Sequence, residues 1–316
     1  MSELILDYEK VSQIEECTEQ EWLIEYLWAK NACGIIGGQP KCCKSWLGLD
    51  MAVSIASKTP CLNFFQVHEK GPVLVFMAED RVEEVKRRIQ EISFARNIDI
   101  NDLELYIIKN TSIMLDSESD CNKLENTVKT IRPKLLLLDP FVRMHRCDEN
   151  SAKEVSHLLS YIRKLERDFN VSVILTHHSS KRLSSRPGQA LRGSSDFHAF
   201  GDSNIYLSRE NDELKLTVEH RTSKSIDPFI IELNAEKNIH LKIKNSKSLI
   251  SAKNQITVHD RIIAVLQEHE DGISRKNLRE ILRISNDTLG KAIKDLLDSC
   301  KLINSDGKLL YNKCAT

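Results

Sequence analysis

The sequence predicts an α/β fold, in which a mostly parallel β-sheet carries helices on both faces, followed by a small C-terminal domain of another kind. Continuous apolar runs, such as residues 73–77 and 135–138, alternate with amphipathic segments. Such runs are typical of strands buried on both faces of a parallel sheet. A glycine-rich loop at residues 37–45 separates the first apolar run from a helix-forming segment. Beyond residue 255 the pattern changes to short amphipathic helices, which indicates a second domain.

A chain of 316 residues is long enough for two domains. The pattern divides it into an N-terminal segment (1–31), an α/β core (32–240), a polar linker (241–255) and a C-terminal domain (256–316). The apolar cluster that ends the N-terminal segment either packs beside the functional site or covers an edge of the sheet.

Composition restricts the partners and the compartment. The net charge of -1 excludes a global basic field, so any contact with nucleic acid must be local. Nine cysteines with no C-x-x-C pair predict reduced thiols in a cytosol. We see no apolar segment of about 18 residues and no signal-like N-terminus, so we expect a soluble, cytoplasmic chain that does not contact membranes.

The glycine-rich loop has the order of a phosphate-binding loop: strand, turn, lysine and hydroxyl, helix. Its residues are Gly37-Gly38-Gln39-Pro40-Lys41-Cys42-Cys43-Lys44-Ser45. Backbone N–H groups and the helix N-terminus would bind the phosphates, Lys44 would reach the β- and γ-oxygens, and Ser45 would hold Mg²⁺. The alternative is an ordinary glycine-rich turn before a helix.

Cys43 occupies the position where the pattern G-x-x-x-x-G-K-[ST] has glycine. A side chain there either crowds the β-phosphate or is turned away from it by the start of the helix. The predicted nucleotide-binding residues are Gly38, Pro40, Lys41, Cys42, Cys43, Lys44, Ser45 and Trp46.

Acidic residues follow the strand predicted at residues 73–77. Asp80 and Glu83 are spaced as the N-cap and N3 residues of a helix over about 81–95. Glu79 remains, at the carboxyl end of the strand where α/β sheets bind ligands, and we expect it to be a general base that activates water.

A second acidic residue ends the run Leu135-Leu136-Leu137-Leu138-Asp139, which has the Walker B form. A carboxylate at this point can hold Mg²⁺ directly or through water. Asp139 is therefore the predicted partner of Ser45 in a magnesium site.

Polar residues at the end of the next buried strand include Thr176 and His177, either of which could sense a γ-phosphate; the alternative is that two histidines merely begin a loop. The segment 179–195 is basic and rich in serine and glycine. Lys181 and Arg192 are among its cations, which would contact a nucleic-acid backbone or a neighbouring subunit unless the loop is only solvated.

Residues 214–219 alternate between apolar and polar, which predicts an antiparallel strand at the sheet edge. The strand leads into a turn with Arg221, a candidate for a residue that acts on another subunit.

The C-terminal pattern predicts three helices, 259–268, 275–282 and 288–297, followed by a hairpin around Asp306-Gly307. Three helices and a hairpin make a winged helix. This module usually binds DNA, and it also serves as a protein docking unit.

These motifs together resemble the RecA-like P-loop ATPases of the plasmid hexameric replicative helicase (RepA) type over residues 20–235. The segments concerned are Glu21-Trp22-Leu23, the loop from Gly38 to Ser45, Ala78-Glu79-Asp80, Leu138-Asp139-Pro140, Asp148-Glu149-Asn150, Thr176-His177-His178 and Arg192-Gly193-Ser194. The resemblance implies that Lys44, Ser45 and Asp139 bind Mg-ATP, that Glu79 is catalytic, and that His178 couples the γ-phosphate to the DNA loop. It further implies that Arg192 or Arg221 acts as an arginine finger in the adjacent subunit of a ring.

The sequence therefore predicts an ATP-dependent, oligomeric, helicase-like DNA motor of a plasmid or mobile element. Single-stranded DNA would bind the 179–195 loop, and duplex DNA would bind the winged helix. The alternative is an ATP-controlled DNA-binding regulator or loader without motor activity.

Overall fold

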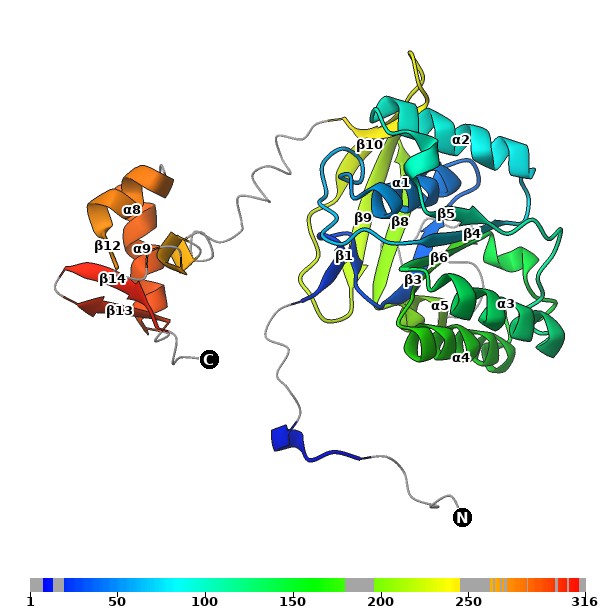
Figure 1. Ribbon diagram of the computed structural model, residues 1–316, viewed down its shortest axis with the longest axis horizontal. Coiled ribbons are helices and arrows are strands. Elements are labelled where there is room, and N and C mark those ends of the chain that lie inside the picture. Colours follow the sequence, from blue (N-terminus) through cyan, green and yellow to red (C-terminus); the bar gives the residue numbers. More distant parts are fainter. Residues whose placement is uncertain are drawn as a thin grey trace. The chain divides into compact units, whose positions relative to one another are not determined.

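The computed structural model in Figure 1 divides into two compact units, one up to Lys244 and one after it. It describes residues 8–13, 20–179, 196–244, 262–263, 265–267, 269, 272–282, 284–298, 301–305 and 307–312. None of the helices in these residues is long and apolar enough to span a bilayer.

A nine-stranded sheet forms the first unit, in the order β11-β10-β9-β8-β3-β7-β6-β4-β5. Six strands are parallel: β3 (Cys33–Gly38), β4 (Val73–Met77), β5 (Leu105–Ile107), β6 (Leu135–Asp139), β7 (Ser172–His178) and β8 (Ser203–Glu210). Three antiparallel strands extend it: β9 (Glu213–His220), β10 (Phe229–Asn234) and β11 (His240–Ile243). Gly38 pairs with His178, and Met77 pairs with Asp139, so the carboxyl ends of four strands meet at one edge.

Helices cover both faces of the sheet (Figure 1). One face carries α1 (Lys44–Ser57) and α2 (Val82–Ala95), and the other carries α3 (Glu118–Ile131), α4 (Ala152–Phe169) and the short α5 (Asp196–Phe200). Helix α4 buries Val155, Leu158 and Ile162 in a core with Leu136 and Leu138 of β6, as its helical spacing predicts. Three 3₁₀ turns complete this part: η1 (Val11–Gln13), η2 (Ile100–Asp102) and η3 (Phe141–Arg143).

The N-terminal apolar cluster folds into a small hairpin of β1 (Trp22–Ile24) and β2 (Trp28–Ala29). The hairpin packs on the beginning of β8 and the end of β9: Ala29 N donates to Ser203 Oγ at 3.1 Å, and Tyr26 O lies 3.1 Å from His220 Nε2. It therefore belongs to the first unit.

Three local predictions need correction. Strand β9 is not at the sheet edge, because β10 and β11 pair beyond it. Strand β11 also extends the core past residue 240, into the expected linker. Asp80 does not cap α2, because the N-cap is Arg81 and the Asp80 carboxylate binds Arg88 instead.

The C-terminal unit contains α8 (Arg275–Leu282), α9 (Asn286–Asp298) and a three-stranded antiparallel sheet. The strands are β12 (Ile273–Ser274), β13 (Leu302–Ser305) and β14 (Lys308–Tyr311), and Gly307 has a φ of +78° in the turn between the last two. Residues 262–263 and 265–267 are helical, and Ile262 and Leu266 lie in the core of this unit. Strand β12 was not among the predicted elements, and part of the first predicted helix lies outside the described residues, so the winged helix stays a prediction.

Candidate functional site

The loop between β3 and α1 depends on close backbone packing. A Cβ added to Gly38 would lie 2.5 Å from Leu207 O and 2.6 Å from Cys42 Sγ, so only glycine fits there. Lys41 and Cys43 both have a left-handed backbone, with φ of 65° and 64°. These two turns bring the chain from β3 to the N-terminus of α1, where free N–H groups and the helix dipole favour an anion.

Cys43 is the N-cap residue of α1, and its side chain makes no capping hydrogen bond. Its left-handed conformation explains why the pattern has glycine here, since a Cβ in this region costs about 1–2 kcal/mol. The loop therefore carries a strained residue at the position where the pattern has glycine.

Lys44 is the cation of the loop. Its side chain is buried, and its Nζ donates to Gly38 O at 3.0 Å and Gln39 O at 2.9 Å. His178 Nδ1 lies 3.3 Å from the same Nζ, so the end of β7 meets the loop at this ammonium group. Burial lowers the pKa of Lys44, and the neighbouring Cys42 and Asp139 oppose that change.

Asp139 ends β6 beside the loop and is only 5% exposed. Thr176 Oγ1 donates to its Oδ1 at 2.5 Å, whereas Oδ2 is buried and has no hydrogen-bond partner among the described residues. Burial raises the pKa of Asp139, and the Ser45 and Thr176 hydroxyls and the Lys44 charge act against that rise. A buried carboxylate oxygen beside a serine hydroxyl fits Mg²⁺, which prefers oxygen ligands and keeps several waters.

No cluster of three or more His, Cys, Asp or Glu side chains in the described parts of the chain could hold a metal ion. Ser45 and Asp139 stay the predicted ligands for Mg²⁺, a cation that proteins usually bind through one or two side chains together with phosphate oxygens and water.

Glu79 follows β4, and Ala78 N donates to Asp139 O at 2.6 Å, which places Glu79 next to the end of β6. Its carboxylate is exposed at the rim and accepts a hydrogen bond from Arg143 Nε at 2.7 Å. Arg143 lies in η3, just after the Walker B segment, and the sequence had not marked it as functional.

A pocket of about 320 Å³ unites these groups. Its lining contains nine residues predicted for the site and three that were not predicted. The former are Lys41, Cys42, Cys43, Lys44, Ser45, Trp46, Glu79, Asp139 and His178, and the latter are Arg88, Pro140 and Leu233. Of the other predicted nucleotide residues, Gly38 supports the loop and Pro40 is exposed within it.

Alternation along β7 separates the three polar residues at its end. Thr176 points to Asp139 and His178 to the pocket, whereas His177 is buried and packs on Phe197 of α5 with ring centroids 4.4 Å apart. The histidine at the pocket is thus His178, as the resemblance implies, and not His177.

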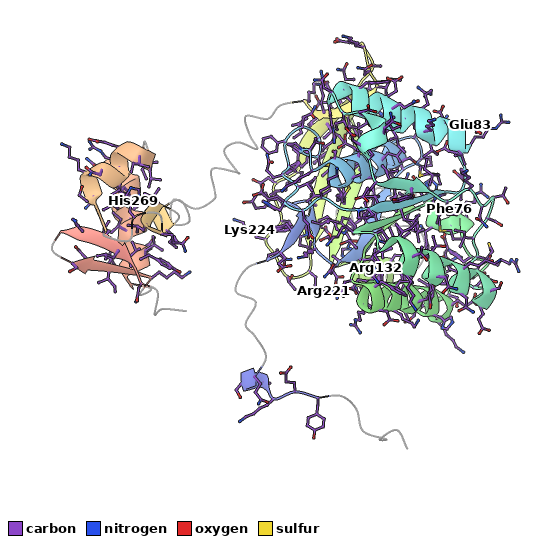
Figure 2. The ribbon with its side chains drawn as sticks, in the orientation of Figure 1. Phe76, Glu83, Arg132, Arg221, Lys224 and His269 are labelled. Carbon is purple, nitrogen blue, oxygen red and sulfur yellow. The ribbon has the colours of Figure 1, made fainter. Side chains whose placement is uncertain are left out.

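Arg221 lies at the opposite edge of the sheet, near α4 in Figure 2, whereas Glu83 marks the beginning of α2 on the other side of the unit. Strand β9 ends where β8 begins, and Arg221 Nη2 donates to Ala199 O at 2.7 Å and Phe200 O at 3.0 Å. Arg221 therefore does not line the pocket of its own chain. Arg192 and the rest of 180–195 are outside the described residues.

Comparisons with known proteins bear on the fold and the family of the chain. The RadB recombinase superposes with a TM-score of 0.50 at 13% identity, over 68% of this chain and 92% of that chain. A KaiC-like protein from the archaeon Pyrococcus horikoshii OT3 superposes with a TM-score of 0.47 at 17% identity, over 69% and 93% of the two chains. No curated protein sequence matches the chain at a significant level.

The likeness to RadB shows the RecA-like α/β fold, and the phosphate-binding loop, Asp139 and Glu79 occupy the edge at which such sheets bind ligands. The model of the family AAA_25, described as an AAA domain, matches residues 6–183, which is more than half of the chain. The chain therefore belongs to the AAA_25 family and has a RecA-like P-loop ATPase core.

Proposed function

We propose that the protein is an oligomeric, ATP-dependent DNA motor, a helicase-like ATPase of the plasmid or mobile-element replication type. The observation that carries the proposal is one pocket in which the loop cation Lys44, the Ser45–Asp139 pair, Glu79 and His178 converge. Those are the parts that phosphoryl transfer to water requires: positioning, charge neutralisation and a base.

Each group has a defined task. The loop N–H groups and Lys44 bind the phosphates, and Ser45 and Asp139 hold Mg²⁺, which would neutralise charge on the β- and γ-oxygens. Glu79 accepts the proton of the water that attacks the γ-phosphorus, so ATP and water become ADP and phosphate. The 2.7 Å hydrogen bond from Arg143 orients the Glu79 carboxylate at the rim.

The γ-phosphate would be sensed by His178, because its ring lies 3.3 Å from Lys44 Nζ at the point where the chain enters the 179–195 loop. Displacement of this ring on hydrolysis would move a loop that binds single-stranded DNA. The position of Arg221 on the far edge supports a ring, a homo-hexamer or another closed oligomer, in which Arg221 or Arg192 completes the neighbour's site.

Duplex DNA would bind the C-terminal unit, read as a winged helix. Lys291 and Lys294 are exposed on α9, and Lys308 is exposed on the β13–β14 hairpin. An exposed helix and a neighbouring hairpin that both carry lysines can contact phosphates of the backbone.

A second function is favoured by Cys43, because it stands where the pattern has glycine and we expect this departure to slow ATP turnover. In that case ATP would control assembly of a DNA-binding regulator or loader.

The test measures ATP hydrolysis and displacement of a strand from a forked duplex by the full chain. We expect DNA-stimulated hydrolysis and ATP-dependent displacement. Lys44→Ala should abolish ATP binding, whereas Lys58→Ala, at the other end of α1, should not. Glu79→Gln should keep ATP affinity and lower turnover about 10²–10⁴-fold, with Glu83→Gln as the control.

Equal turnover in Glu79→Gln and the parent would remove Glu79 from the reaction. ATP-dependent duplex binding without strand displacement would favour the regulator or loader over the motor.

A further inference from the structure

Trp46, Arg88 and Leu233 are among the lining residues of the pocket that have no task in the phosphate chemistry. They come from α1, α2 and β10, which lie far apart in the sequence. We call them the Trp46–Arg88–Leu233 wall.

Arg88 is fixed by three ionic hydrogen bonds. Its Nη1 and Nη2 donate to the two Asp80 oxygens at 2.9 and 3.0 Å, and its Nε donates to Glu84 Oε1 at 3.1 Å. The guanidinium carbon lies 5.7 Å from the centre of the Trp46 ring, over its face. The role of Asp80 is therefore to hold Arg88 against Trp46.

Leu233 supplies the apolar part of the wall and is 39% exposed, although it is a large hydrophobic residue. Strand β10 leads into a hairpin beside α2 (Figure 1), and Ile239 N in this hairpin donates to Glu91 Oε2 of α2 at 2.9 Å. The hairpin is thus attached to the helix that carries Arg88, so the wall is built on connected elements.

An indole ring, a guanidinium plane and an apolar side chain form a surface for a flat heteroaromatic ring. A hydrogen-bonded readout of base edges needs free donors, and three of the five Arg88 N–H groups already bind Asp80 and Glu84. Stacking attracts every base, whereas a pocket without directed polar groups discriminates weakly between similar ligands.

We propose that the Trp46–Arg88–Leu233 wall binds the nucleobase of the substrate by stacking, so that the protein accepts ATP and GTP with similar affinity. The proposal rests on the nucleotide-binding function above and names the part of the nucleotide that this end of the pocket takes. It assigns Arg88 and Leu233 to the site and makes Asp80 a positioning residue.

The test compares binding of ATP, GTP and inorganic tripolyphosphate to the full chain. Tripolyphosphate has the phosphate chain without a base, so it separates the wall from the phosphate loop. In the parent protein, ATP and GTP should bind within about tenfold of each other, and tripolyphosphate more weakly. Trp46→Ala should weaken ATP and GTP by roughly 5- to 150-fold and leave tripolyphosphate unchanged.

Matched variants separate stacking from damage to the loop. Trp46→Phe should restore most of the affinity, because it keeps an aromatic face. Asp80→Asn should weaken ATP but not tripolyphosphate, and Phe94→Ala, on an exposed aromatic residue of α2, should change neither.

Two results would reject stacking of the base on the wall without rejecting the nucleotide site. One is unchanged ATP affinity in Trp46→Ala, and the other is an equal loss of affinity for ATP and for tripolyphosphate in this variant. A parent that binds ATP more than about 100-fold more tightly than GTP would show a hydrogen-bonded readout instead. A parent that binds neither ATP nor tripolyphosphate in a Lys44-dependent way would reject the nucleotide function itself.

Discussion

Cys43 shows how one residue can violate a sequence pattern and keep its geometry. The position requires a φ of about +64°, which glycine reaches without a penalty and cysteine does not. The neighbouring N–H groups remain in place because α1 still begins at Lys44. The thiol is half-buried and lines the pocket. It therefore either crowds a bound phosphate or is turned away from it.

Replacing this thiol tests the choice directly. We expect Cys43→Gly to tighten ATP binding about tenfold, since relief of crowding worth about 1.4 kcal/mol corresponds to that factor. The change in the free energy of unfolding should stay small, because lost strain and added chain entropy oppose each other. Titration of both proteins with ATP at a fixed Mg²⁺ concentration measures the change in affinity.

The control is Cys43→Ala, which shortens the side chain and keeps the strained backbone. A glycine variant with an unchanged or larger dissociation constant would show that the thiol is averted from the phosphate.

Contiguous motifs made most of the site predictable. Lys44, Ser45 and Asp139 carry their chemistry within short segments that have characteristic neighbours, and the structure brings them together. Arg88 and Arg143 have no such local signal: Arg88 acquires its place only when α2 packs against α1, and Arg143 only when η3 folds beside Glu79. Arginine is common on helix surfaces, so its type alone could not distinguish these two.

At the scale of elements, α1 is the helix on which the loop depends, and a buried ion pair fastens it. Asp50 of α1 is 1% exposed and binds Arg96, the residue after α2. Leu62 N donates to Asp50 Oδ1 at 2.8 Å, and Arg96 Nη1 donates to Ser54 Oγ at 2.7 Å. The pair therefore joins both helices that form the walls of the pocket.

We expect Asp50→Asn to lower the free energy of unfolding by about 3–5 kcal/mol, because it leaves the Arg96 charge buried without a counterion. Urea denaturation of both proteins measures the difference. The exposed pair Lys242–Glu232 is the control, and Lys242→Ala should cost less than about 1 kcal/mol. A loss in Asp50→Asn as small as in this control would mean that hydrogen bonds, not the charge, hold α1.

Strands β3, β4, β6 and β7 were predictable because they are short runs buried on both faces. In the antiparallel extension, β9 was predicted as an antiparallel strand, but its place inside the sheet and strand β11 were not. Strand β9 buries alternate residues and resembles an edge strand, although β10 and β11 pair beyond it. Strand β11 is a four-residue segment with two charged or polar positions, His240 and Lys242, so its sequence resembled a linker; only pairing with β10 makes it a strand.

At the scale of the whole molecule, the segment that matches the family model ends at a different residue from the first compact unit. The match ends at residue 183, the α/β unit continues to Lys244, and the C-terminal unit has its own apolar core. Because Ile262, Leu278, Leu289 and Leu309 pack within that unit, it does not need the sheet to bury its apolar residues. We therefore expect DNA binding by the C-terminal unit and ATP hydrolysis by the α/β unit to be separable functions.

A chain that ends at Lys247 should keep ATP hydrolysis and lose affinity for duplex DNA, because the complete pocket lies in the first unit and the exposed lysines lie in the second. The full chain with Lys291→Glu and Lys294→Glu should show the same loss without truncation. If these lysines contact phosphates, the slope of log affinity against log salt should fall by about 1 for each contact removed. Lys276→Glu on α8 is a control for a change of charge elsewhere in the unit. Duplex affinity that survives both truncation and charge reversal would assign the C-terminal unit to protein docking, since the DNA contact would then have to lie within the α/β unit.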